Sequence, residues 1–167
     1  SAVNDSASGA QVIDGSLKFD NDKSTYLTRT PINAGNRMTW TWSGWVKRSG
    51  FGSRCGFFAT QNTKDYFEFW GGTNEELVIT LGNSASQRLE TTAFYRDTGW
   101  YHIVVALDTT LSNSSDRMKL YVNGSRVTQF DTEGQPAQDY QCEEINNTNA
   151  HYIGADYSLT SNQYFDG

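Results

Sequence analysis

Apolar and polar residues alternate along most of this chain, in short runs separated by clusters of Gly, Asn, Asp and Ser. In residues 38–47 every second residue is apolar as far as Trp42, and residues 101–107 keep the same period. Period-two alternation at a spacing of about ten residues is typical of β-sandwiches and barrels. The pattern therefore predicts an all-β fold of antiparallel strands. We expect strands at residues 16–19, 26–28, 38–47, 55–59, 66–70, 77–81, 88–93, 101–107, 118–122, 126–130, 151–154 and 164–167.

Three local features refine this pattern. The apolar phase slips at Gly44-Trp45, which predicts a β-bulge in that strand. The dipeptide Asn123-Gly124 predicts a tight hairpin turn between two strands. Residues 131–149 are polar and irregular, and a loop of that length is usually functional or disordered.

The composition excludes several classes of protein. The chain has 167 residues, enough for one domain with a core, and 14% of them are aromatic, which disfavours disorder. Charged residues make up 19%, and the net charge of −6 argues against nucleic-acid binding. Since no run of about 18 apolar residues occurs, we expect no membrane insertion. We expect a flexible or extended segment at residues 1–14 and a single domain at residues 15–167.

The chain has two cysteines, Cys55 and Cys142. Their spacing does not decide between a disulfide and free thiols, and we favour free, buried thiols. With two histidines and no clustered spacing of ligands, a structural zinc site is not expected.

Residues 100–108, a polar loop and residues 118–124 resemble the signature of laminin-G-like domains. In this motif an aromatic residue opens a long core strand, and an antiparallel strand follows it and ends in a tight turn. Residues 15–20 and 42–47 resemble the first two strands of the same domains. Laminin-G-like domains belong to the concanavalin A-like superfamily of lectins and glucanases. The resemblance therefore implies an antiparallel jelly-roll β-sandwich over residues 15–167.

Residues 26–31, 34–48, 117–124 and 151–154 also resemble the laminin-G-like modules of tailed-bacteriophage virion proteins, of the kind found in cyanophages. That resemblance implies a virion-surface structural or adhesion module of a tail fibre, a spike or the capsid exterior. Its expected partners are other virion proteins, further copies of itself as a homo-oligomer, and a host-surface glycan. The alternative is a carbohydrate-binding or adhesion domain of a larger secreted cellular protein, with an extracellular location.

In those virion proteins a closing strand follows the segment that corresponds to residues 164–167. The resemblance therefore implies that the sandwich in this chain lacks its closing C-terminal strand. Either the chain is a fragment, or a partner supplies the strand at an open sheet edge.

Carbohydrate binding is a natural hypothesis for an aromatic-rich jelly roll, since a sugar ring stacks its apolar face on an exposed aromatic ring. Trp70 precedes a polar loop that includes Asn74, and Tyr140 and Tyr157 lie in later polar loops. These four residues are the candidate glycan ligands. The alternative is that they pack against the sandwich or a neighbouring subunit. We assign the other tryptophans to the core or to strand edges: Trp40, Trp42, Trp45 and Trp100.

Calcium is considered because domains of the resembled family often bind it through oxygen ligands. The candidate ligands are Asp20, Asp22 and Asp108, with Asp131 and Asp156 as further acidic positions. Asp20 and Asp22 place carboxylates close together, but the same segment also favours a plain turn, and no EF-hand pattern surrounds it. We therefore expect no obligatory cofactor, with calcium as the ion to test.

The sequence does not predict an enzyme. Glycosidases need two carboxylates about 5–9.5 Å apart. Glu75-Glu76 and Glu143-Glu144 are adjacent pairs, and adjacent residues of a strand point to opposite faces. Glu68 is a single acidic residue on a predicted strand. We therefore expect a binding or structural module without catalytic residues.

Overall fold

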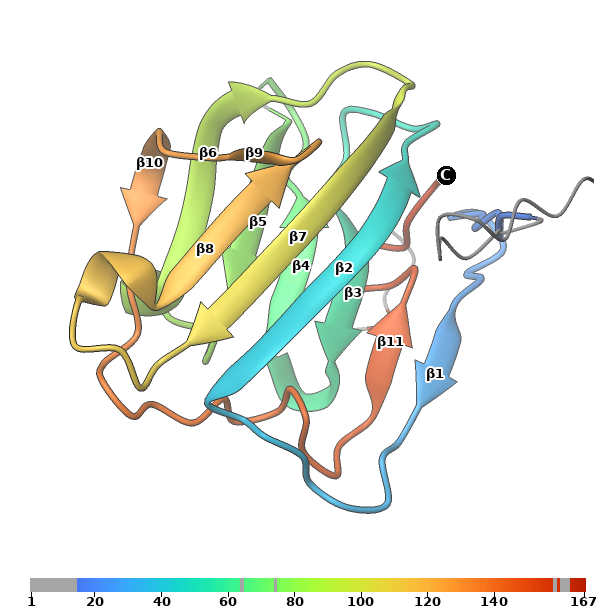
Figure 1. Ribbon diagram of the computed structural model, residues 1–167. Helices are drawn as coiled ribbons and strands as arrows, with labels where there is room; N and C mark the ends of the chain where they lie inside the picture. The colour runs from blue at the N-terminus through green and yellow to red at the C-terminus, as the bar shows by residue number, and fades with distance from the viewer. Residues whose placement is uncertain (1–14, 64, 74, 158, 160–162) are drawn as a thin grey trace, which may run out of the picture.

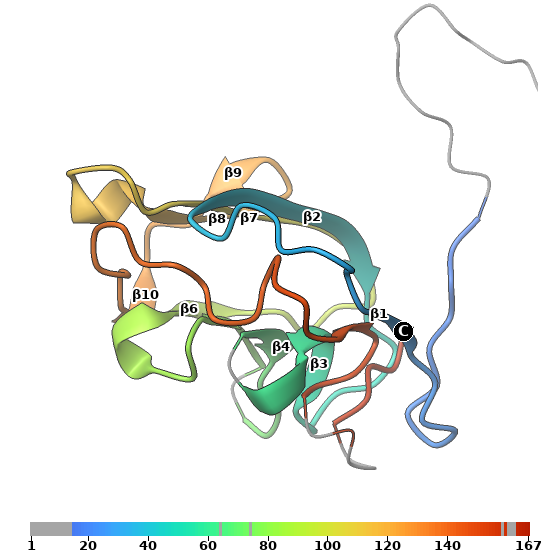
Figure 2. The same ribbon diagram turned by 90° about the horizontal axis from the view of Figure 1, so that it is seen from below.

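The computed structural model describes residues 15–63, 65–73, 75–157, 159 and 163–167, and these residues form two packed β-sheets (Figure 1). The predicted flexible segment 1–14 lies outside this range. Figure 2 shows the two layers edge-on, with β2, β7 and β8 in one layer and β3, β4 and β6 in the other. The predicted all-β architecture is confirmed.

The described residues form strands and short 3-10 helices, with one long connection between β10 and β11. In chain order they are β1 (Leu27–Arg29), β2 (Thr39–Lys47), β3 (Cys55–Thr60), η2 (Gln61–Thr63), β4 (Tyr66–Phe69), β5 (Glu76–Thr80), η3 (Ala85–Gln87), β6 (Arg88–Phe94), β7 (Trp100–Asp108), η4 (Ser114–Asp116), β8 (Met118–Val122), β9 (Ser125–Arg126), β10 (Phe130–Glu133) and β11 (His151–Ile153).

The two sheets of the described chain differ in width. One has seven strands in the order β1-β11-β3-β4-β5-β6-β10, and the other has four in the order β2-β7-β8-β9. Every neighbouring pair is antiparallel, as predicted. Because the sheets are unequal, β11 and β1 extend past the outer edge of β2 in Figure 1.

The predicted bulge at Gly44-Trp45 is wrong, because β2 pairs with β7 in one continuous register from end to end. Gly44 keeps the inward phase of Trp42 and Val46, while Trp45 points outward. A Cβ atom on Gly44 would lie 2.7 Å from the indole of Trp42. The apparent slip in the apolar pattern is therefore an inward glycine whose space the Trp42 ring fills.

Aromatic rings from both sheets make up much of the core. The Trp42 ring lies 5.5 Å from that of Phe57 and 6.0 Å from that of Phe58, centroid to centroid, and Phe58 lies 5.0 Å from Phe67. Edge-to-face and tilted contacts at such distances add to the burial of apolar surface. The assignment of Trp42 to the core is confirmed.

The predicted hairpin turn at Asn123-Gly124 is confirmed. Both residues have positive φ, 51° and 80°, and the turn joins β8 to β9. Asn123 tolerates this conformation, and its Oδ1 also accepts a hydrogen bond from the backbone N–H of His102 at 2.8 Å.

Residues 126–130 do not form the single predicted strand. The N–H of Val127 still donates to the carbonyl of Leu120 at 2.9 Å, after which the chain crosses to the other sheet and pairs as β10 with β6. Val127 and Phe130 both pack against the core, one from each sheet. Residues 131–133, at the start of the predicted loop 131–149, therefore belong to β10.

Residues 16–19 are not a strand, contrary to the prediction. Phe19 nevertheless exchanges two backbone hydrogen bonds with Gly167, at 2.7 and 3.3 Å. On the other side of the same C-terminal segment, Phe165 donates to the carbonyl of Gly154 at 3.0 Å. These few bonds are too short a ladder to make a strand, but they hold residues 165–167 between two parts of the chain.

A buried aspartate fixes the long polar stretch at residues 131–149. The carboxylate of Asp65 accepts backbone N–H groups from Gly82 at 2.8 Å, Glu144 at 3.2 Å and Ile145 at 2.8 Å. Burial raises the pKa of Asp65, and these backbone donors oppose that rise. The polar stretch is therefore an ordered cover over one end of the sandwich.

Both cysteines are free and buried, as favoured from the sequence. The indole N–H of Trp40 donates to Sγ of Cys142 at 3.4 Å, and burial raises the pKa of that thiol to about 12. None of the helices in the described residues is long and apolar enough to cross a membrane.

Candidate functional site

The outer face of the seven-stranded sheet carries a group of aromatic and charged residues centred on β4. Strand alternation places Tyr66 and Glu68 on this face, and Trp70 follows β4 directly. The chain after β11 folds across part of the face, so that the Tyr157 ring lies 5.4 Å from the Tyr66 ring. This cover explains why Tyr66 and Glu68 are buried although they point away from the sandwich core.

Glu68 ties two of its neighbours together. The Trp70 indole N–H donates to Oε1 of Glu68 at 2.7 Å, and Nε of Arg54 donates to Oε2 at 2.5 Å. The Glu68 side chain is fully buried, whereas one third of the Arg54 side chain is exposed. Burial raises the pKa of Glu68, and the bonds from Arg54 and Trp70 oppose that rise. Since both oxygens are engaged, Glu68 positions its neighbours rather than meeting a ligand.

Two guanidinium groups lie over aromatic rings of the same group. Arg54 lies 5.5 Å from the ring centre of Tyr66 and 6.0 Å from that of Tyr157, and Arg88 lies 5.4 Å from that of Trp70. Arg88 also donates to the hydroxyl of Tyr66 at 3.4 Å. Cation–π contacts of this kind hold both partners in place. We call the whole group the Trp70 cluster: Arg54, Tyr66, Glu68, Trp70, Arg88 and Tyr157.

The Trp70 cluster combines an aromatic ring with charged hydrogen-bond donors. Its indole is half-buried, so part of the ring remains open to stack on an apolar surface. Arg88 brings charged N–H donors beside that ring, and Arg54 brings them beside the neighbouring rings of Tyr66 and Tyr157. Such donors form strong bonds to hydroxyl, carboxylate or phosphate oxygens. An apolar platform flanked by donors is the combination that a sugar ring requires.

Two of the four predicted glycan ligands, Trp70 and Tyr157, come together in this cluster through Glu68, Arg54 and Tyr66. Sequence reasoning missed the two arginines, because their place depends on the pairing of β3 with β4 and of β5 with β6. Glu68 did stand out as a single acidic residue on a predicted strand.

The other two candidate ligands lie elsewhere. Tyr140 packs against the core, its carbonyl accepts the hydroxyl of Thr109 at 2.8 Å, and burial raises its pKa. Asn74 lies outside the described residues. Glycan binding by Tyr140 and Asn74 stays a prediction.

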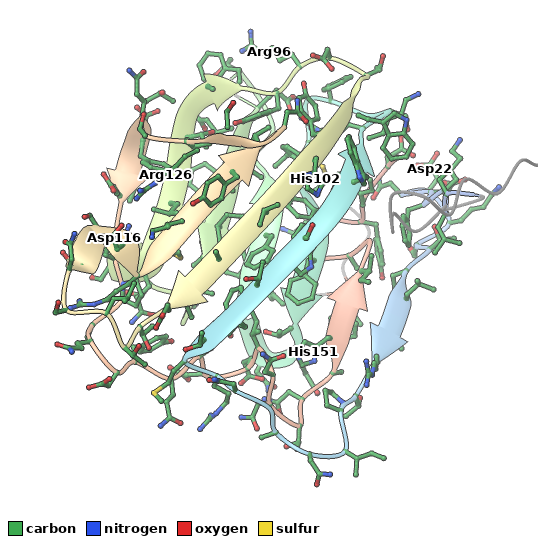
Figure 3. The ribbon with its side chains drawn as sticks, in the orientation of Figure 1. Asp22, Arg96, His102, Asp116, Arg126 and His151 are labelled. Atoms are coloured by element: carbon green, nitrogen blue, oxygen red, sulfur yellow. The ribbon has the colours of Figure 1, made fainter. Side chains whose placement is uncertain are left out.

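The predicted calcium ligands fall into two places. Asp20 and Asp22 line a cavity of about 150 Å³ together with Asp166 and Arg54, on the side of the molecule where Figure 3 labels Asp22. Asp108 pairs with the first residue of β2, at the opposite end from Lys47, and its carboxylate accepts two bonds from Thr110. The described residues contain no group of three or more His, Cys, Asp or Glu side chains that could hold a metal ion.

A second aromatic pair lies on the outer face of the four-stranded sheet. The Trp45 side chain is 61% exposed, and its ring lies 4.9 Å from that of His102, the β7 residue labelled in Figure 3. Trp100 is 48% exposed, and the ammonium group of Lys47 lies 6.0 Å from its ring centre. Both tryptophans thus lie on solvent-facing positions of β2 and β7.

Comparison with solved structures shows the same fold in proteins of low sequence identity. A heptameric SAP-like pentraxin from Limulus polyphemus superposes with a TM-score of 0.61 at 14% identity, covering 85% of this chain and 65% of that one. Domains LG4-5 of the mouse laminin alpha1 chain give 0.54 at 13% identity, covering 87% and 37%. The CBM40 module of the Ruminococcus gnavus IT-sialidase gives 0.53 at 14% identity, covering 84% and 86%.

These neighbours confirm the jelly-roll sandwich, and at such identities they show the fold alone. This chain spans less than two thirds of the pentraxin and of the laminin fragment. The comparison with curated proteins gives no significant match. A family model, by contrast, matches residues 19–167, almost the whole described chain. The protein therefore belongs to the laminin-G-like family of the concanavalin A-like lectin/glucanase superfamily.

Proposed function

We propose that this domain is a non-enzymatic glycan-binding and adhesion module, and that the Trp70 cluster is its binding face. The observation that carries the proposal is the fixed, half-buried Trp70, whose indole is held by Glu68 and flanked by Arg88. The family and the CBM40 neighbour support a binding role of this kind.

The arrangement of the cluster favours a sugar with an apolar face and oxygen-rich substituents on one side. The ring face stacks on Trp70, while the guanidinium of Arg88 or Arg54 donates to hydroxyl or carboxylate oxygens. Because Glu68 already fixes the indole and Arg54, little side-chain entropy is lost when the sugar binds. Binding at a single site is expected to be weak, and several copies would raise the effective affinity.

A glycan array followed by titration calorimetry with the strongest hit tests this proposal. Trp70→Ala is expected to weaken binding at least about tenfold, the equivalent of about 1.4 kcal/mol. Trp45→Ala is the matched control, since it removes an exposed indole from the other sheet and is expected to leave binding unchanged. Equal loss in both variants, or binding unaffected by Trp70→Ala, would contradict the assignment of the site.

We further propose that the module works on a virion surface, in contact with other virion proteins and further copies of itself. This narrower proposal rests on the resemblance of residues 26–31, 34–48, 117–124 and 151–154 to phage modules. Mass spectrometry of purified particles from the source tests it, with the protein expected in the particle fraction. Recovery as part of a secreted cellular protein would favour the extracellular alternative.

A further inference from the structure

The outer face of the seven-stranded sheet carries a second exposed aromatic ring, that of Phe94 at the end of β6. Tyr95 packs into the core, so strand alternation points Phe94 outward, and Phe94 is 49% exposed. The guanidinium of Arg96 lies 4.7 Å from the ring centre of Phe94, much as Arg88 lies over Trp70. The same face therefore carries two pairs of an aromatic ring and an arginine.

Trp70 and Phe94 lie in one row across the sheet. The N–H of Trp70 donates to the carbonyl of Glu76 at 2.9 Å, and Glu76 is paired with Phe94. Because Leu77 packs into the core, Glu76 shares the outer face with both. Neighbouring strands are about 4.8 Å apart, so two strand spacings separate the two backbone positions by roughly 10 Å. Rings at such a separation suit a ligand with several rings in line better than a single sugar.

The surface between and beside the two rings is polar. Glu76 is only 3% exposed, so its side chain does not project between the rings. Arg96 donates to the carbonyl of Thr73, which holds its guanidinium beside the connection from β4 to β5. Glu90, on the same face of β6, accepts the hydroxyl of Thr132 at 3.1 Å. Guanidinium donors and a carboxylate acceptor along one row match the hydroxyl groups of a sugar chain.

We propose that Phe94 and Arg96 form a second subsite of the glycan-binding face, and that the ligand is a linear oligosaccharide lying across β4, β5 and β6. One sugar ring stacks on Trp70 and a ring further along the chain stacks on Phe94, while Arg96 donates to its hydroxyl oxygens. The inference rests on the proposed glycan binding at the Trp70 cluster. Since a linked second ring binds at a high effective concentration, a chain binds more tightly than its single sugar.

A series of chain lengths tests the inference. The probes are 1,4-linked chains of glucose, of N-acetylglucosamine and of galacturonic acid with one to five units, measured by titration calorimetry. We expect the longest chain of the preferred sugar to bind at least about tenfold more tightly than its monosaccharide, because only a chain reaches from Trp70 to Phe94. In NMR spectra the backbone amides of Phe94 and Arg96 are expected to shift with the chain and not with the monosaccharide.

Variants of Phe94 separate the two subsites. Phe94→Ala is expected to weaken binding of the chain about tenfold and to leave monosaccharide binding unchanged, whereas Trp70→Ala weakens both. Phe94→Tyr keeps the ring and should bind the chain like the parent protein. Trp100→Ala is the matched control, since it removes a ring of 48% exposure beside the ammonium group of Lys47 on the other sheet. The melting temperature of each variant checks that it folds.

Arg96→Met tests the donors of the second subsite, since it keeps a carbon chain over Phe94 and removes the N–H groups. It is expected to weaken binding of the chain several-fold. Equal affinity for the monosaccharide and the longest chain, or a chain affinity that Phe94→Ala leaves unchanged, would overturn the inference and leave glycan binding at Trp70 intact. Absence of binding by every probe would overturn the proposed function and this inference with it.

Discussion

The outer faces of the two sheets both carry tryptophans, but they hold them differently. On the seven-stranded sheet, Trp70 is anchored through its N–H to the buried Glu68 and flanked by Arg88. On the four-stranded sheet, Trp45 is 61% exposed and lies against His102, and no hydrogen bond to its indole is seen within the described residues. The more exposed ring is thus the less constrained one.

This difference teaches that exposure is a poor guide to a binding site. A ring whose orientation is fixed before binding loses less entropy when a ligand stacks on it. A ring that is merely exposed covers its strand neighbours and remains free to move. The comparison favours the Trp70 cluster over the Trp45 face as the proposed glycan site.

The largest expected difference between the two faces is in stability. Glu68→Ala leaves the Trp70 indole N–H and the partly buried Arg54 without their acceptor, and we expect it to lower the free energy of unfolding by about 3 kcal/mol. His102→Ala removes the ring beside Trp45 and an exposed hydrogen bond of 3.0 Å with the Ser43 hydroxyl, and we expect a loss below about 0.5 kcal/mol. Chemical denaturation measures both. Similar losses would mean that the two faces are equally constrained.

The next effect concerns the inner side of the four-stranded sheet. Gly44→Ala places a methyl group against the Trp42 indole, and we expect it to lower the free energy of unfolding by about 2 kcal/mol. Ser43→Ala, one position away on the exposed side, is the control and should cost little. If Gly44→Ala were neutral, the Trp42 ring would have room to move away from the added methyl group.

These residues also show what the sequence could and could not predict. Alternation located most strands and assigned Trp42 to the core, because period two is a local property of the chain. It misread Gly44 as a bulge, because glycine has no side chain to mark which face of the strand it lies on. The sequence pattern is the same whether the strand slips there or the ring of a neighbouring residue fills the space. It also missed the crossing between β9 and β10, because Val127 and Phe130 lie in one short run of sequence that resembles a single strand.

The candidate site was predictable only in part, for a related reason. Trp70 and Tyr157 were recognised as residue types suited to sugars, but their meeting depends on the chain after β11 folding over β4. Arg54 and Arg88 carried no signal, because an arginine on a strand gains a role only from the residues paired beside it. Contacts across several strands depend on register, which a single sequence does not reveal.

A smaller effect is expected in the pH dependence of stability. Burial holds the pKa of Glu68 above its ordinary value of 4.5, so over the window above that value the folded state keeps a proton that the unfolded state has lost. The parent protein should therefore be stabilised by Glu68 protonation below pH 4.5 and lose that contribution as the pH rises through the folded pKa. Glu68→Gln does not titrate. The difference in unfolding free energy between the two proteins, measured from pH 4 upward, should follow this trend, and a constant difference would contradict it.

The smallest expected effect is that of calcium on stability. Its candidate ligands lie on two different sides of the molecule. Asp20 borders the cavity beside Arg54, and its carboxylate already accepts the N–H of Lys23 at 3.2 Å and pairs with the Lys23 ammonium at 3.4 Å. Asp108, at the far end of β2, accepts two bonds from Thr110. These carboxylates already have hydrogen-bond or ion-pair partners, and they do not converge on one point. We therefore expect calcium to add little to the stability of the fold. A bound ion would stabilise the fold in proportion to the logarithm of its concentration.

We therefore expect the melting temperature to change by less than about 1 °C between calcium and chelator, since a ΔΔG of 1 kcal/mol corresponds to about 2–4 °C in a domain of this size. Asp22→Asn and Asp108→Asn serve as paired variants. A larger shift that only Asp22→Asn abolishes would place an ion in the cavity beside Arg54, and a metal would then help to order the side of the molecule that carries Trp70. A shift that only Asp108→Asn abolishes would place the ion at the end of the four-stranded sheet, and the face of Trp45 would then be the more constrained of the two.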